Sequence, residues 1–176
     1  MLVILASLAP LRAGEHDVPI TWHAAPRHLP LLFFASGSGV HMTLRQFRGR
    51  IVLLNVWATW CPTCRRELPT LDRFQKKLGG KDFEVVALSI DRDGAEAISP
   101  FFTEIGIKNL LVYFERRGTV LGKYVIVGLP TTLVIDREGR EIGRATGAAD
   151  WDKPEMAAVL RKLIDARTGV RIEGRP

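Results

Sequence analysis

The segment that decides the fold reads LLNVWATWCPTCRRELP over residues 53–69. It overlaps the almost continuously apolar run IVLLNVW at 51–57, which is typical of a strand buried on both faces of a parallel or mixed sheet. A helix is predicted to follow, ending at a Gly-Gly pair at 79–80. Cys61 and Cys64 therefore lie where a buried strand passes into a helix. The helix is predicted to turn these apolar side chains inward: Leu68, Leu71, Phe74 and Leu78.

The two cysteines predict redox chemistry. Two thiols three positions apart at the start of a helix can close a disulfide. The unpaired N–H groups and the positive end of the helix dipole favour a thiolate on the first sulfur. We therefore expect Cys61 to attack the disulfide of a partner protein and Cys64 to resolve the mixed disulfide. The sequence has no other cysteine, so a framework of structural disulfides is excluded.

Other uses of this cysteine spacing are less well supported. A structural zinc site needs four ligands, and all four histidines lie before residue 42. Covalent attachment of haem needs a histidine directly after the second cysteine, where the chain has Arg65. A purely structural disulfide would close so short a loop that it removes little chain entropy.

Upstream of the cysteines, the patterns are weaker. Residues 14–30 are polar and interrupted by prolines, which predicts a linker or an irregular N-terminal arm. LLFFAS at 31–36 predicts a short strand, followed by a turn at 37–39. Thr43 is positioned to cap a short helical turn that ends at Gly49.

Downstream, FEVVALSI at 83–90 predicts a second buried strand. Apolar residues at helical spacing over 98–105 predict a helix that ends at Gly106, with Pro100 marking the start of its regular part. NLLVYF at 109–114 predicts a short strand or an extended run.

The last part of the chain predicts a β-hairpin and a helix. The hairpin consists of TTLVID at 131–136 and REIGRAT at 140–146. Asp152 and Glu155 form an N-terminal capping pattern for the helix. The inward face of this helix is predicted to comprise Met156, Val159, Leu160, Leu163 and Ile164. The order of elements predicts one α/β domain with helices on both faces of a sheet.

The composition sets outer limits on function. The chain has 176 residues, 47% of them hydrophobic, which suits one domain with some additional chain. Lys and Arg number 25 against 19 Asp and Glu, but only residues 161–175 are persistently basic. This predicts a solvated last helix and tail rather than a nucleic-acid surface. LVILASLA at 2–9 is too short to span a membrane and suits the apolar core of a signal peptide, with Ala13 as a cleavage point, although no basic residue precedes the apolar run.

Specific motifs resemble a known family. WATWCPTC at 57–64 resembles the active-site segment of thioredoxin-like proteins. The longer segment at 53–69, with GLPTTLVIDREGR at 128–140, resembles the TlpA/ResA/CcmG branch of exported bacterial thiol–disulfide oxidoreductases. GAADWDKPEM at 147–156 is most similar to the TlpA members. The resemblance covers roughly residues 40–166 and implies a thioredoxin fold, in which helices flank both faces of a four-stranded mixed sheet.

The resemblance also implies an organisation and a location. A signal peptide or anchor remnant would occupy residues 1–13, and an N-terminal arm with a short strand would occupy 14–42. The thioredoxin-like domain would span 43–166, followed by a basic tail at 167–176. The protein would act in the periplasm or another extracytoplasmic space, with its N-terminus either cleaved or serving as a membrane anchor.

The family's client-binding residues can be carried over one by one. Pro130 matches a cis-proline that faces the cysteines, and the preceding Leu129 would pair its backbone with an extended client. X–Pro bonds are the common place for cis geometry. Trp60 would lie beside the client groove, together with Pro62 and Thr63 of the motif.

The family's acidic position falls on Glu67, three residues after Cys64. Its carboxylate would disfavour the thiolate or relay protons. The alternative is a surface glutamate on a solvated helix. Asn55 occupies the strand position at which cytoplasmic thioredoxins carry a buried acid, which leaves Glu67 as the alternative carboxylate. Trp57 is expected in the core, and no role is predicted for Trp151, Trp22 or the histidines.

The function implied is that of an exported protein-disulfide reductase without cofactor or metal. It would take electrons from a membrane thiol transducer and pass them to oxidised client proteins. The clients would be copper-site assembly proteins of cytochrome oxidase or proteins of cytochrome c maturation, and no nucleic acid is involved. One alternative is a thiol oxidase of the same fold, although residues 91–128 are short for that family's helical insertion. Another is a metallochaperone or non-enzymatic copper-binding adaptor.

Overall fold

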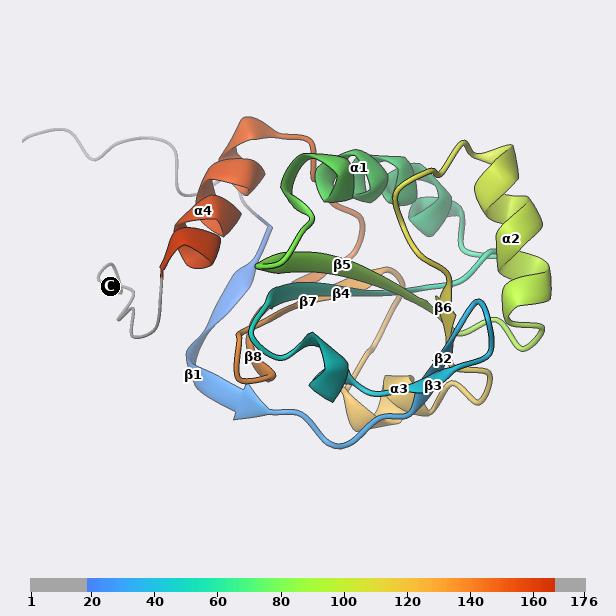
Figure 1. The fold of residues 1–176 in the computed structure, drawn as a ribbon, viewed down its shortest axis with the longest axis horizontal. Helices are drawn as coiled ribbons and strands as arrows, with labels where there is room; N and C mark the ends of the chain where they lie inside the picture. The colour runs from blue at the N-terminus through green and yellow to red at the C-terminus, as the bar shows by residue number, and fades with distance from the viewer. Residues whose placement is uncertain (1–18, 167–176) are drawn as a thin grey trace, which may run out of the picture.

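The computed structural model describes residues 19–166, shown as the coloured ribbon in Figure 1. The signal or anchor segment predicted at 1–13 and the tail predicted at 167–176 lie outside the described residues. The elements in chain order are β1 (Thr21–His28), β2 (Phe34–Ser36), β3 (His41–Met42), the 3₁₀ helix η1 (Leu44–Phe47), β4 (Ile51–Trp57), α1 (Pro62–Leu78), β5 (Phe83–Ser89), α2 (Ala95–Glu104), β6 (Tyr113–Phe114), α3 (Thr119–Lys123), β7 (Thr131–Ile135), β8 (Arg140–Thr146) and α4 (Pro154–Asp165).

The strands form one mixed sheet of eight, in the order β1-β8-β7-β4-β5-β6-β2-β3. β4 lies at its centre, parallel to β5 and antiparallel to β7. The four strands that the thioredoxin resemblance implies are the contiguous β8, β7, β4 and β5, and the sheet extends beyond them on both sides. The predicted hairpin is confirmed, because β7 and β8 pair antiparallel from Thr131↔Thr146 to Ile135↔Glu141.

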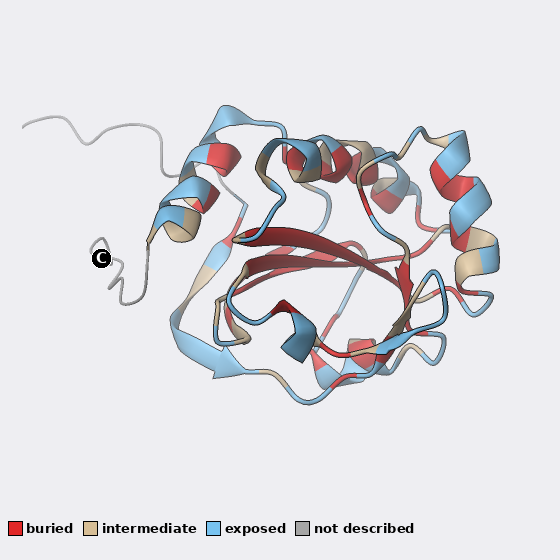
Figure 2. Ribbon diagram, viewed as in Figure 1, coloured by how far each residue is buried: buried red, intermediate tan, exposed pale blue. Residues whose placement is uncertain are grey.

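Helices cover both faces of this sheet, as predicted (Figure 1). α1, α2 and α4 pack on one face, where Leu68, Ile98 and Leu160 join one hydrophobic cluster. η1 and α3 cover the opposite face through Phe47 and Val120. Every residue of β4 is buried, and the central strands are red in Figure 2. Burial on both faces explains why the sequence of β4 is apolar without alternation.

The N-terminal arm differs from its prediction as an irregular segment. Much of it forms the edge strand β1, which pairs antiparallel with β8 and whose register shifts between Trp22 and Arg27. Pro26 falls within this irregular stretch, which suits a proline because it cannot donate to a ladder. The side chains of β1 are mostly exposed, so the strand shows no apolar alternation, and its pairing comes from the open edge of β8.

Three local predictions around the core are confirmed. The run at 31–36 contains β2, and a turn follows at 37–38. Thr43 caps η1: its side-chain oxygen accepts from the backbone of Arg45, and Gln46 accepts from the backbone of Thr43 in return. Such reciprocal bonds satisfy N–H groups that a helix start leaves unpaired.

Two predicted helix starts are wrong. α2 begins at Ala95 rather than Pro100, because Gly94 starts the helix and burial of Ile98 stabilises the turn before the proline. α4 begins at Pro154, where the fixed φ of proline suits the first helical position. Asp152 does not cap it, because its carboxylate accepts from Arg73 Nε at 2.6 Å.

None of the helices within residues 19–166 is both long and apolar enough to span a membrane.

A buried carboxylate on α1 organises the chain before β6. Asp72 Oδ1 accepts from the backbone N–H groups of Lys108, Asn109 and Leu110 at 3.0, 2.6 and 3.0 Å. Its Oδ2 accepts from Asn109 Nδ2 at 2.8 Å. One side chain thereby pairs three consecutive backbone donors. In the run at 109–114, predicted as a short strand or an extended run, only Tyr113–Phe114 forms a strand.

We predict that Asp72→Ala lowers the free energy of unfolding by about 3 kcal/mol, because it leaves several buried donors without partners. Urea unfolding would measure this loss. Asp165→Ala, which removes an exposed carboxylate near the end of α4, should change stability by less than about 0.5 kcal/mol. A loss at Asp72 as small as that of the control would show that the 108–110 segment is held by other contacts.

Candidate redox site

The cysteines form a disulfide at the start of α1. Their Cα atoms are 5.3 Å apart, and Cys61 is the N-cap residue of the helix. Its sulfur accepts from the backbone N–H of Cys64 at 3.2 Å. The first sulfur therefore lies among the unpaired N–H groups of the helix, as predicted. Cys61 is 5% exposed and Cys64 is 0% exposed, so the second cysteine is also the more buried one.

Two of the predicted client-binding residues, Thr63 and Leu129, are linked to Cys61. Thr63 Oγ1 lies 3.3 Å from Cys61 Sγ and donates to the carbonyl of Leu129 at 3.4 Å. The Leu129–Pro130 bond is cis, which confirms that prediction. The loop before β7 thus runs beside the disulfide, although it is more than sixty residues away in sequence.

The motif's remaining predicted residues lie on the surface of this region. Trp60, directly before Cys61, is 66% exposed, and Pro62 is exposed as well. Trp57 is buried, as predicted, and stacks on Phe101 and Phe102 with ring centroids 5.5 Å away. The exposed Trp60 therefore places apolar surface directly before the buried Cys61.

Glu67 is buried, so its interpretation as a surface glutamate is wrong. Only 2% of the residue is exposed. Its Oε1 accepts from Trp151 Nε1 at 2.7 Å and from the backbone of Ala149 at 3.1 Å, and its Oε2 accepts from Asn55 Nδ2 at 3.2 Å. Burial raises the pKa of this carboxyl above its ordinary value, while the three donors oppose that rise.

The polar network continues from Glu67 into the sheet. Asn55 on β4 also donates to Thr132 Oγ1 on β7 at 2.8 Å. Within the described residues, Asn55 Oδ1 has no hydrogen-bond partner. Sequence reasoning missed Trp151 and Thr132, because neither lies at an informative spacing from the cysteines. The only available signal for Trp151 was its place in the TlpA-like segment at 147–156.

A second missed carboxylate supports the chain before the cysteines. Asp91, just after β5, accepts from the backbone and the hydroxyl of Thr59 at 2.9 and 2.7 Å. It also accepts from the hydroxyl of Ser89 at 2.6 Å. Asp91 is 6% exposed, so these bonds are largely shielded from water. They fix the turn that carries Trp60 and Cys61.

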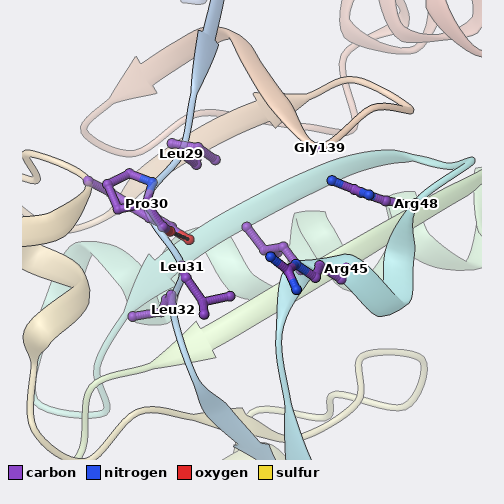
Figure 3. Close-up of a pocket in the computed structure, with 9 residues that line it drawn as sticks. Leu29, Pro30, Leu31, Leu32, Arg45, Arg48 and Gly139 are labelled. Carbon is purple, nitrogen blue, oxygen red and sulfur yellow. Dashed lines mark hydrogen bonds between the residues drawn. The ribbon is translucent and has the colours of Figure 1, made fainter.

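A separate hollow lies away from the disulfide and includes no predicted site residue. Arg45 and Arg48 border it on one side, and residues 29–32 border it on the other (Figure 3). Its buried lining residues, Leu32 and Tyr124, belong to the cluster beneath the sheet, whereas both cysteines belong to the cluster above it. In residues 19–166, no three His, Cys, Asp or Glu side chains gather as around a metal ion.

Comparisons with known proteins agree with this geometry. The Redoxin family model matches residues 25–160. The thiol-disulfide oxidoreductase ResA of Bacillus thuringiensis subsp. konkukian (strain 97-27) is 29% identical over 133 residues, which cover 71% of this chain and 70% of that protein. The crystal structure of a thiol:disulfide interchange protein DsbE from Chlorobium tepidum superimposes with a TM-score of 0.69 at 26% identity, covering 79% of this chain and 96% of that one.

A third similarity concerns the fold alone. The exposed lipoprotein thioredoxin Etrx1 of Streptococcus pneumoniae strain TIGR4 has a TM-score of 0.62 at 24% identity, over 77% of this chain and 99% of that one. The curated relatives are named as thiol–disulfide oxidoreductases, and the structure places a CxxC disulfide at a helix start. The chain therefore belongs to the Redoxin family, as a thioredoxin-fold thiol–disulfide oxidoreductase of the TlpA/ResA/CcmG-like branch.

Proposed function

We propose that this enzyme passes electrons outward, as a dithiol that reduces disulfides in client proteins. The observation that carries this direction is the buried carboxylate of Glu67, one helical turn beyond Cys64. A negative charge in a dry site near the thiols disfavours thiolates. An exchanger whose reduced form is stabilised is a strong oxidant, so a destabilised one is a better reductant. Glu67 thus supports a reductase over an oxidase of the same fold.

The exchange proceeds in two balanced steps. The Cys61 thiolate attacks one sulfur of the client disulfide, a mixed disulfide forms, and the other client sulfur leaves as a thiolate. Cys64 then loses its proton and attacks the Cys61 sulfur, which releases the second client sulfur. The client gains two electrons, and the enzyme ends with the Cys61–Cys64 disulfide.

Glu67 is the group we assign to the proton of Cys64. Cys64 is fully buried, so water is excluded from its sulfur and a protein group must accept the proton. A carboxyl with a raised pKa suits this role, because it takes up protons nearer neutral pH than an exposed glutamate does. Its bonds to Trp151 and Asn55 hold the carboxylate in place.

The client groove is assigned to Trp60, Pro62, Thr63, Leu129 and Pro130. The contact of Thr63 with both Cys61 and the Leu129 carbonyl supports this assignment. An extended client would pair its backbone with the loop at 129, as in strand addition, so that its disulfide meets Cys61.

We place the enzyme outside the cytoplasm, with clients in copper-site assembly or cytochrome c maturation and a membrane thiol transducer as electron donor. The apolar run at 2–9 and the resemblance to exported members of the branch support this placement.

The direction of transfer predicts a reducing potential. Equilibration with glutathione buffers, followed by thiol counting, should give a value more negative than about −230 mV, nearer thioredoxin than protein disulfide isomerase. A value near about −120 mV would identify an oxidase instead. Copper that stays bound through purification, without disulfide exchange, would favour the adaptor.

The two cysteines are predicted to react at very different rates. In the reduced protein, iodoacetamide should modify Cys61 at least about tenfold faster than Cys64, because Cys61 lies at the helix start and Cys64 is buried. Mass spectrometry of partly alkylated protein gives both rates. Cys64→Ser should accumulate mixed disulfides with client proteins, and the matched Cys61→Ser should not. Equal alkylation of both thiols would contradict these roles.

Glu67→Gln should move the pH midpoint of Cys61 alkylation downward by about one unit, because it removes a negative charge from the neighbourhood of the thiols. The amide can still accept from Trp151 and Ala149. Asn55 can rotate so that its unpartnered Oδ1 accepts from the new amide. Glu155→Gln, at an exposed position of α4, is the control and should leave the midpoint in place. If the pH dependence of Cys61 alkylation is unchanged in Glu67→Gln, Glu67 does not tune the thiols.

A further inference from the structure

Two exposed valines lie on the loop that leads to the redox site. Val125 is 68% exposed and Val127 is 86% exposed, the largest value for any large apolar side chain in residues 19–166. Between them, Ile126 is buried and anchors the loop to the core beneath the sheet. Exposed aliphatic side chains at successive outward positions cost solubility, so they indicate a surface that is covered during function.

The backbone of Val125 is strained. Its φ of 52° makes it the only non-glycine residue with a positive φ in the part of the chain that the structure describes. This conformation is a genuine outlier for a β-branched residue, and such strain persists where the surroundings determine it. The exposed side chain gains little burial in return, so the packing of this residue alone does not explain its conformation.

Arg144 and the buried Glu141 form an ionic clamp that holds the loop in this shape. Arg144 donates to the carbonyls of Val125 and Tyr124 at 3.0 and 3.1 Å. Its guanidinium is itself fixed by both carboxylate oxygens of Glu141, at 2.6 and 2.8 Å. Glu141 is 2% exposed, and its Oε1 is 2.7 Å from His23 Nε2 on β1. The edge strand and β8 therefore determine how the valines are presented.

The clamped loop lies beside the reacting sulfur. Leu129 is joined through Thr63 to Cys61, and Val127 is only two residues before Leu129. Two residues span at most about 7 Å, so Val127 lies next to the place where an extended client would pair. Trp60, directly before Cys61, is 66% exposed and adds apolar surface on the cysteine side of the site.

We propose that Val125 and Val127 are specificity residues, which select an extended client segment with uncharged aliphatic side chains beside its reactive cysteine. The proposal rests on the proposed reductase function and names the substrate class of that same site. Backbone pairing at Leu129 does not depend on the client's sequence, so discrimination must come from side chains next to it. A client with aliphatic side chains buries apolar surface against Val125 and Val127, and this burial supplies the discrimination. The clamp reduces the ordering that binding would otherwise require.

The test compares two disulfide-containing peptides that differ only beside the reactive cysteine, with Leu on both sides in one and Gln on both sides in the other. Reduced enzyme is mixed with each peptide in single turnover, and the second-order rate of peptide reduction is measured. The ratio of the two rates should be about fivefold in favour of Leu, which is modest because the surface is open. Taking a ratio within each protein cancels changes in the reactivity of the dithiol.

Three variants sharpen the test. V125S/V127S should lower the ratio to below about twofold, and Val127→Ile should keep or raise it, because the aliphatic surface remains. Val40→Ser is the matched control and should keep the parent ratio. Val40 is a 59% exposed valine next to β3, which three intervening strands separate from β4.

The outcomes separate the inference from the proposed function. A parent ratio near one, or a ratio that survives V125S/V127S, overturns the role of the valines while the reductase assignment stands. Failure of the enzyme to reduce either peptide overturns the reductase assignment and this inference with it. Since both valines are exposed, the melting temperature of V125S/V127S should lie within a few degrees of that of the parent. A lower ratio of peptide reduction rates in this variant then reflects client selection and not a loss of stability.

Discussion

The burial of the Glu67 carboxylate is the constraint around which the redox site is built. A carboxylate removed from water is costly unless donors compensate it. Here the donors are three residues from two segments: Asn55 on β4, and Ala149 and Trp151 between β8 and α4. The same bonds therefore tie the cysteine helix to the central strand and to the approach to the last helix. The position of α1, and hence of both sulfurs, depends on them.

Other buried carboxylates also hold neighbouring segments in place through hydrogen bonds. Asp91 fixes the turn before the cysteines, Asp72 fixes the loop before β6, and Glu141 orients Arg144 beneath the client loop. Asp72 and Asp91 bind groups of loop residues directly, whereas Glu141 acts through Arg144, which donates to the carbonyls of Val125 and Tyr124. These bonds hold the loops in one arrangement.

The two sulfurs form one disulfide but have different surroundings. Cys61 lies at the helix start, next to Thr63, which donates to the Leu129 carbonyl. Cys64 is sealed beneath it, with Glu67 one turn farther along the helix. The helix start favours thiolate on the first sulfur, whereas the buried carboxylate opposes charge near the second. One helix thus gives the two sulfurs different electrostatic surroundings.

The sequence by itself determined β4, the cysteine helix and the hairpin of β7 and β8, because apolar periodicity and turn residues are local signals. The motif also identified both cysteines and the cis bond at Pro130. Only the tertiary structure decided the environment of Glu67, since its partner Trp151 is 84 residues away and no local pattern links them. The edge strand β1 and the start of α4 were missed for the same reason. β1 is ordered by pairing with a strand far along the chain, and Asp152 binds Arg73 of another helix instead of capping its own.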